Sequence, residues 1–230
     1  MRADAVLSRY GYCSRREAPQ WIRAGRMSYR GEVLRRPADR VEPGEVLVDG
    51  APVPFVNGLY VAFHKPLGCT CSHREEGRLI YDLLPEQWQR RSGGVSSVGR
   101  LDKETSGLLL LTDDGAFVHA LTSPKRHVPK IYAYECSAPV PESAPELFAS
   151  GSLMLEGETT PCLPAELVRE TALAGRLTLH EGRYHQVRRM LAAVGAPVVR
   201  LHRLAIGPLS LEELHLAPGE WCAIDPTIFD

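Results

Sequence analysis

Four consecutive leucines, Leu108 to Leu111, constrain this chain most, because they lie between a polar loop and an abrupt turn. The loop reads Gly-Arg-Leu-Asp-Lys-Glu-Thr-Ser-Gly from residue 99, and the turn is Asp113-Asp114-Gly115. A short apolar run bounded by turn residues is typical of a buried strand. Asp102 precedes that strand, where a carboxylate is costly to desolvate. It caps a turn, pairs with a cation or takes part in chemistry, and the residues alone leave these alternatives open.

Other apolar patterns predict more short strands and a few helices. Strands are expected near residues 27–29, 45–48, 59–63, 131–136, 165–168, 176–179 and 198–201. Helices are expected near residues 5–10, 14–24, 116–121, 142–149 and 184–194. Many short strands without a regular strand–helix–strand rhythm favour an α+β fold, with a mixed, mostly antiparallel sheet flanked by helices.

The helix expected at 184–194 has one apolar stripe, formed by Val187, Met190, Leu191 and Val194 at helical spacing. Arg188 lies at the edge of this stripe. From there a guanidinium can reach a buried carboxylate while its stem packs on apolar side chains.

Proline, asparagine and glycine between residues 51 and 58 indicate a linker. We therefore expect a first domain at 1–52, a linker at 53–58 and a second domain at 59–230, with hinge motion between the domains. In the first domain, Ser14-Arg-Arg-Glu17 reads as a capping box that opens a helix. Pro19 predicts a kink in that helix or a late start.

Basic residues are clustered although the formal net charge is only −1. Residues 1–36 hold nine arginines, no lysine and three acids, and residues 183–203 hold five arginines and no acid. Such clusters on a nearly neutral protein favour a local RNA or phosphate contact over indiscriminate coating of nucleic acid. Solvated arginine-rich helices remain the alternative for any single residue.

The same residues argue against several other classes of protein. With no long apolar run and six scattered cysteines, we expect no signal peptide, no membrane span and a reducing cytoplasm. Cys69-x-Cys71-x-His73 lacks a second ligand pair, so ordinary thiols are favoured over a zinc site. Phosphate-binding glycine loops and a G-x-S-x-G elbow are absent from the sequence, and we expect neither a metal nor a cofactor.

The first fifty residues resemble the S4 RNA-binding domain. Two arginine-bearing helices, short strands and the ending Val46-Leu-Val-Asp-Gly50 carry this resemblance. The opening Arg2-Ala-Asp-Ala5 and Pro19 depart from the usual pattern. The resemblance implies RNA contacts by the front domain.

The rest of the chain resembles the pseudouridine synthase family that modifies ribosomal RNA. Four segments agree in order: His64-Lys-Pro-Leu-Gly68, Gly99 to Gly115, Lys130-Ile-Tyr132, and Glu181 to Leu191. His64 departs from the asparagine that the family often has before Lys-Pro. The sequence of residues 182–187 is similar to the corresponding motif of the branch acting on small-subunit (16S) ribosomal RNA. An S4-like domain and a synthase domain are thus the expected architecture.

This resemblance implies a role for each matching residue. Asp102 is the catalytic carboxylate, acting on a uridine flipped out of RNA whose uracil is detached and rejoined through carbon five. Tyr132 stacks on the flipped base, and Arg188 pairs with Asp102. The substrate-binding residues are Arg100, Lys130 and Leu191, of which Leu191 forms an apolar wall. The RNA-binding residues are Arg2, Arg15, Arg16, Arg23, Arg26, Arg183 and Arg189. No cofactor takes part.

Two other functions remain open, namely the same reaction on 23S ribosomal RNA and a non-catalytic RNA-binding or ribosome-assembly protein. The expected partner is ribosomal RNA in a partly assembled small subunit. We expect a monomer that has no contact with a membrane.

Overall fold

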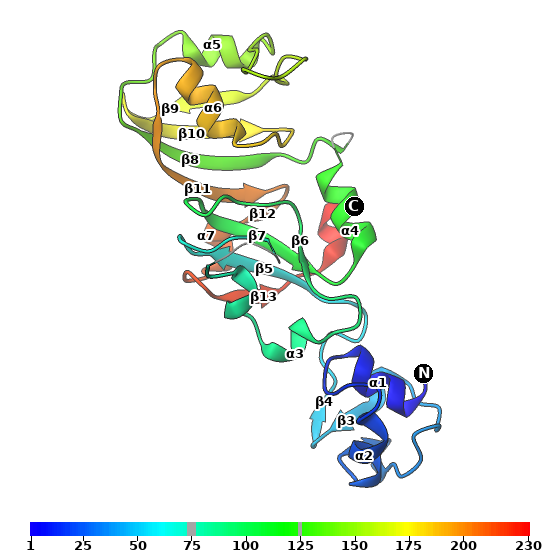
Figure 1. Cartoon of the computed structure of the whole chain (residues 1–230). Coiled ribbons are helices and arrows are strands. Elements are labelled where there is room, and N and C mark those ends of the chain that lie inside the picture. The colour runs from blue at the N-terminus through cyan, green and yellow to red at the C-terminus, as the bar shows by residue number, and fades with distance from the viewer. Residues whose placement is uncertain (73–76, 124–125) are drawn as a thin grey trace.

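The computed structural model describes residues 1–72, 77–123 and 126–230. Figure 1 shows an elongated molecule with a small four-stranded sheet at one end and a large nine-stranded sheet over the rest. Within these ranges, no helix has the length and apolar character needed to cross a bilayer.

The small sheet belongs to the N-terminal unit. Its strands, in the order β2-β1-β3-β4, are β1 (Met27–Tyr29), β2 (Glu32–Val33), β3 (Val46–Val48) and β4 (Ala51–Pro52). The helices α1 (Ala3–Arg9) and α2 (Ala18–Arg23) share a core with this sheet, to which Leu7, Ile22 and Val46 contribute fully buried side chains.

The expected capping box forms, but it does not open α2 directly. The backbone N–H of Ser14 donates to the Glu17 carboxylate, and the N–H of Glu17 donates to the Ser14 hydroxyl. These bonds close a turn, and α2 begins after it with Pro19 in its first turn. The late start predicted from Pro19 is therefore confirmed, because the first helical turn does not need the N–H that proline lacks.

The large sheet has the order β13-β5-β7-β11-β8-β10-β9, with β12 added to β11 and β6 added to β7. Among the pairs described, β7 with β11 is parallel and the others are antiparallel. The expected mixed, mostly antiparallel sheet is confirmed. Its strands are β5 (Tyr60–Lys65), β6 (Ser96–Ser97), β7 (Ser106–Thr112), β8 (Lys130–Cys136), β9 (Glu166–Arg169), β10 (Ala174–Leu179), β11 (Val198–Ile206), β12 (Leu209–Ser210) and β13 (Trp221–Ala223).

Short helices flank this sheet. They are α3 (Glu86–Gln89), α4 (Gly115–Thr122), α5 (Ala144–Ala149), α6 (Gln186–Ala193) and α7 (Leu211–Leu214), with 3-10 turns at Ile80–Leu83 and Pro226–Phe229. A further 3-10 turn, Pro43–Glu45, precedes β3 of the small sheet. Two of the differences from expectation bear on the candidate site. The helix expected from Tyr184 begins at Gln186, and the strand expected to end at Leu201 continues to Ile206.

The four leucines of β7 are buried on both faces of the large sheet. Leu109 and Leu111 belong to the core that also contains Met190 and Leu191 of α6. Leu108 and Leu110 belong to a second core, on the side of α4 and α7. Successive side chains of a strand point to opposite faces, so an unbroken apolar run needs cover on both sides.

Gly107 lets β7 and β11 meet next to the loop that carries Asp102. Its φ is +114°, and a Cβ built there would lie 2.2 Å from the Arg203 carbonyl oxygen and 2.5 Å from the Arg203 nitrogen. Both the backbone conformation and the close approach require glycine.

The joint between the N-terminal unit and the large sheet is packed. Arg91 is 5% exposed, and its guanidinium binds Asp113 at 2.7 Å and the carbonyls of Pro54 and Phe55. The same guanidinium lies 5.1 Å from the ring of Tyr10 in the N-terminal unit. The expected flexible linker is thus held at several points, because its backbone carbonyls find a buried cationic donor.

Candidate active site

The loop from Gly99 to Thr105, between β6 and β7, carries Asp102. It closes as a turn in which the N–H of Thr105 donates to the Asp102 carbonyl at 3.0 Å. Leu101 is buried, and its N–H and C=O both contact the buried Cys71 thiol, at 3.5 and 3.4 Å. The Asp102 side chain is 35% exposed and remains accessible.

Lys65, at the end of β5, holds this loop through hydrogen bonds to its backbone. Its side chain is fully buried, and its Nζ donates to the carbonyls of Pro66 at 3.0 Å, Thr105 at 2.8 Å and Lys103 at 3.5 Å. Burial lowers the pKa of Lys65, while the nearby thiols and Asp102 act in the opposite direction. The buried ammonium therefore binds the backbone that directly follows Asp102, at residues 103 and 105.

Residues at the start of α6 reach the same loop from the other side. His185 precedes α6 in the left-handed conformation, with φ +49°, and its Nε2 lies 3.2 Å from Asp102 Oδ1. Arg188 donates to the Glu104 carbonyl at 2.8 Å and to the Val198 carbonyl at 3.2 Å.

The ion pair expected between Arg188 and Asp102 is not present in this structure, where the basic side chain in contact with the Asp102 carboxylate is His185. The physical reason is local. The guanidinium donors of Arg188 are used by two backbone carbonyls, and the left-handed residue before the helix turns the imidazole toward the carboxylate.

Tyr132 on β8 lies against a buried arginine on β11. Tyr132 is 9% exposed, and Arg203 Nη1 lies 3.5 Å from its hydroxyl oxygen. Arg203 is 2% exposed and donates from Nε to the Leu108 carbonyl at 2.7 Å, while its Nη2 has no hydrogen-bond partner among the described residues. Burial and the charge of Arg203 lower the pKa of the half-buried Lys130, whose Nζ donates to the Val128 carbonyl.

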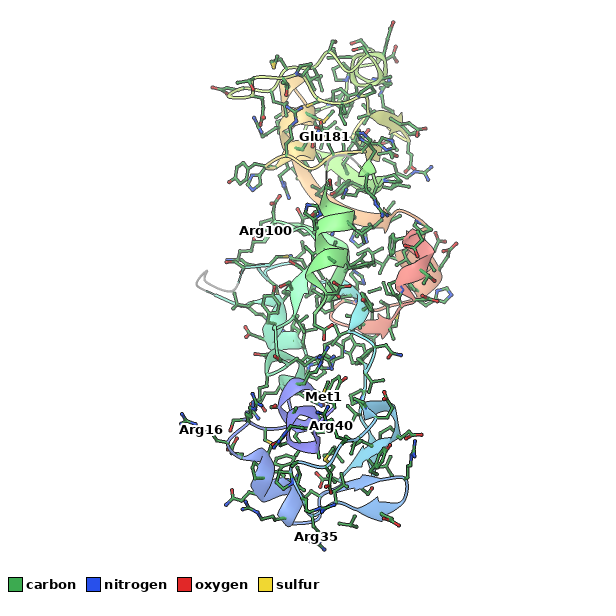
Figure 2. All side chains as sticks on the ribbon, turned by 90° about the vertical axis from the view of Figure 1, so that its right-hand side faces the viewer. Met1, Arg16, Arg35, Arg40, Arg100 and Glu181 are labelled. Carbon is green, nitrogen blue, oxygen red and sulfur yellow. The ribbon has the colours of Figure 1, made fainter. Side chains whose placement is uncertain are left out.

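The other expected substrate-binding residues have contrasting surroundings. Leu191 is fully buried in the same core as Tyr132 and Val187 of the predicted stripe. Arg100 is exposed, two residues before Asp102, and is labelled in Figure 2 between the small domain and Glu181.

Cys69 and Cys71 are buried, whereas His73 lies outside the described residues. In the described part of the chain, no group of histidine, cysteine or acidic residues could hold a metal ion.

His64, the departure from the expected motif, lies away from the loop. Its Nδ1 donates to the Leu216 carbonyl at 2.8 Å, and its ring is 5.4 Å from that of His202. Neighbouring strand residues face opposite sides of the sheet, so His64 and Lys65 belong to different faces.

Arginines of the front domain fall into two groups. Arg2 binds Asp4 at 2.6 Å, and Arg26 binds Asp49 and lies 3.4 Å from the ring of Trp21. Arg15, Arg16 and Arg23 are exposed as well, and in the described part of the chain they form no salt bridge. Figure 2 shows Arg16 projecting from the margin of this domain.

Beside α1 and α2 lies a groove of about 1170 Å³, lined by residues of both units. Its lining includes Arg9, Tyr12, Arg15, Trp21 and Arg90. Cationic and aromatic side chains in one groove suit a nucleic-acid strand.

Arg183 and Arg189 are engaged inside the protein. Arg183 pairs with Glu181 at 3.1 Å and Glu158 at 3.4 Å, and Arg189 pairs with Glu158 at 2.8 Å. Their side chains are 15% and 26% exposed. They hold the 156–161 segment, and a phosphate contact by either residue stays a prediction.

Sequence reasoning gave no role to Lys65, His185 or Arg203. All three lie inside recognised motifs or basic clusters, so the sequence did indicate that these positions belong near the site. Apart from the adjacent Pro66 carbonyl, however, the hydrogen-bond partners of Lys65 and Arg203 lie 38 to 95 residues away in the chain, and no local pattern reports such partners.

Comparisons with known proteins agree with this geometry. Residues 59–159 match the RNA pseudouridylate synthase family, and residues 1–51 match the S4 domain. The ribosomal small subunit pseudouridine synthase A of Escherichia coli (strain K12) is 39% identical over 226 residues, covering 96% of this chain and 95% of the relative. Its counterpart in Pasteurella multocida (strain Pm70) is 38% identical over 224 residues, covering 96% and 94%.

A solved structure is similar over the whole chain. A pseudouridylate synthase crystal structure superposes with a TM-score of 0.68 and 35% identity, covering 100% of this chain and 98% of that one.

Proposed function

The chain belongs to the RNA pseudouridylate synthase family, and on that premise we propose that it converts a specific uridine of small-subunit (16S) ribosomal RNA to pseudouridine, with Asp102 as catalytic carboxylate. The substrate follows the names of relatives that share almost the full length.

One observation carries the assignment of Asp102. Three basic side chains from distant parts of the chain, Lys65, His185 and Arg188, all bind the short loop around it. Two of them bind only backbone carbonyls, so they hold the loop without covering the carboxylate. A rigid loop that presents a partly exposed carboxylate suits a group that must meet a reacting atom.

The proposed reaction leaves the composition of the RNA unchanged. The bond from uracil N1 to ribose C1′ breaks, a bond from uracil C5 to C1′ forms, and the proton on C5 is exchanged for one on N1. Asp102 acts on the flipped nucleotide, Tyr132 stacks on its base, and Leu191 forms an apolar wall. Lys130 and Arg100 contact the same nucleotide or its phosphate. Because atoms are only rearranged, the reaction needs no cofactor.

We propose that residues 1–52 bind RNA at a distance from the reacting uridine, and that residues 59–230 hold the catalytic site, with 53–58 between them. The groove with its arginines and aromatic side chains supports the first part. The front-domain contacts proposed are Arg2, Arg15, Arg16, Arg23 and Arg26. Because Figure 1 places this domain at the opposite end from α6, the RNA must span both ends. A folded segment of a partly assembled small subunit, bound by one copy of the protein in the cytoplasm, meets that need.

Pseudouridine mapping tests the function. Purified protein is incubated with unmodified small-subunit particles, naked 16S RNA and naked 23S RNA, and pseudouridine is detected as a carbodiimide adduct by primer extension. We expect one new stop in 16S RNA that Asp102→Asn, which keeps shape but loses the charge, does not produce. A stop only in 23S RNA would reassign the substrate, and RNA binding without any stop would favour a non-catalytic RNA-binding protein.

A further inference from the structure

Tyr184, which none of the roles above uses, is the most exposed of the large apolar and aromatic side chains in the described residues. It is 76% exposed and directly precedes the His185 that contacts Asp102. Its ring stacks on the His185 imidazole, with the centroids 3.9 Å apart and the planes at 15°. The tyrosine is therefore two contacts away from the catalytic carboxylate.

The backbone of Tyr184 is held in place. Arg189 donates to the Tyr184 carbonyl at 3.1 Å, and the same guanidinium binds Glu158 at 2.8 Å and the Glu156 carbonyl at 2.5 Å. With its backbone held and its ring stacked on His185, the side chain loses little conformational freedom when a ligand binds it.

One face of the ring is covered by His185, and its high exposure leaves the opposite face in water. A solvent-exposed aromatic face beside a catalytic carboxylate suits a planar ligand whose own faces are poorly hydrated. Every nucleobase has such a face, and an unpaired base gains from stacking whatever its identity.

We propose that Tyr184 is the stacking platform for an unpaired RNA base next to the target uridine. This inference rests on the proposed function and adds a second base site to it. The target base itself is assigned to Tyr132, which is 9% exposed in the core, whereas Tyr184 lies at the surface. The platform would hold the strand beside the flipped nucleotide and accept any base there.

The test uses the full-length protein and RNA carrying 2-aminopurine. Ribonuclease protection on unmodified 16S RNA defines the bound segment, and 2-aminopurine is placed on either side of its candidate uridine in separate oligonucleotides. Wild type is compared with Tyr184→Phe, which keeps the ring, and Tyr184→Leu, which keeps apolar volume only. Leu173→Ala, an exposed apolar residue on the turn between β9 and β10, is the control.

We expect 2-aminopurine fluorescence on one side to be quenched by wild type and by Tyr184→Phe, but not by Tyr184→Leu. Tyr184→Leu should bind about 10-fold more weakly, equivalent to about 1.4 kcal/mol, with an unchanged single-turnover rate at saturating RNA. Wild-type affinity and quenching in Tyr184→Leu would overturn the platform. So would a slower saturating rate at unchanged affinity and quenching, because Tyr184 would then only support His185.

Product formation separates the two proposals. Tritium release from RNA labelled at uridine C5 reports catalysis by wild type independently of fluorescence. Ring-dependent quenching without any product would contradict the proposed function and support the platform. Product formation without ring-dependent quenching would support the proposed function and contradict the platform.

Discussion

Arg188 and Lys65 bind the backbone of the loop that carries Asp102, which changes what their removal should do. Arg188 donates to the Glu104 carbonyl, and Lys65 binds the carbonyls of Lys103 and Thr105. Neither side chain contacts the Asp102 carboxylate, whose neighbour in this structure is the His185 imidazole. We therefore expect both side chains to affect catalysis through the position of the loop, an effect that charge alone does not replace.

Arg188→Ala should slow the single-turnover rate at saturating RNA by about 100-fold, because a catalytic group displaced by about 1 Å costs that much. RNA affinity should change little, since the bonds lost are internal. Arg188→Lys keeps the charge but cannot bind both carbonyls in the same fork, and should recover only part of the rate.

The control is Arg200→Ala, which removes an arginine that is 84% exposed and paired with Glu135. Its rate should match wild type. An Arg188→Ala enzyme with the wild-type rate would show that the loop keeps its position without that guanidinium.

At the scale of single elements, β7 leads from the loop that carries Asp102 to α4. Asp114 lies between β7 and α4 and caps the helix. The Asp114 carboxylate accepts from the N–H groups of Ala116 and Phe117 at the start of α4, and from the Tyr60 hydroxyl at 2.8 Å. The Tyr60 bond, followed by these backbone bonds, holds the pKa of Asp114 below its ordinary value of 3.8. This stabilisation is therefore present above pH 3.8 and is lost as pH falls through the lowered pKa.

Asp114→Ala should reduce the free energy of unfolding by about 1 kcal/mol at pH 7, the usual cost of losing a helix N-cap. The difference from wild type should narrow as the pH is lowered from 7 toward 3. Urea unfolding at a series of pH values measures both effects. Asp114→Asn, which keeps a capping oxygen but has no charge, should lie between Asp114→Ala and wild type at pH 7. A constant deficit of Asp114→Ala at all pH values would contradict the role of ionisation.

At the scale of the whole molecule, Arg91 joins the parts that the sequence predicts to be hinged. Its guanidinium binds Asp113 after β7, the Phe55 carbonyl in the linker, and the ring face of Tyr10 in the N-terminal unit. Arg9 and Tyr10 add backbone bonds, accepting from the Ser92 N–H and from the Gln87 side chain. We therefore expect a stiff joint in the free protein.

Small-angle scattering tests this joint. The radius of gyration of wild type should be the same with and without RNA, when RNA is contrast-matched. Arg91→Ala should increase it and should lower the free energy of unfolding by about 3 kcal/mol, because Asp113 loses a nearly buried partner. Arg90→Ala removes the exposed neighbouring pair with Glu86 and should change stability by less than about 1 kcal/mol. A wild-type radius that shifts on RNA binding would restore the hinge.

Across these scales, local patterns determined much of the protein. The apolar run Leu108 to Leu111 predicted a buried strand, and the spacing of Val187, Met190 and Leu191 predicted the buried face of α6. Short-range periodicity reports which side of an element is buried, and that information is complete within one element. The ordered motifs also led to the family, which the comparisons bear out.

Only the tertiary structure decided which groups meet. The left-handed backbone at His185 gives Asp102 its partner, and Gly107 allows β11 to pair parallel to β7 against Arg203. Lys65 reaches a loop 38 residues further along the chain. Such contacts depend on how distant strands are ordered in the sheet and on single backbone conformations. Neither leaves a periodic trace in the sequence, so the loop could be recognised from sequence while its supports could not.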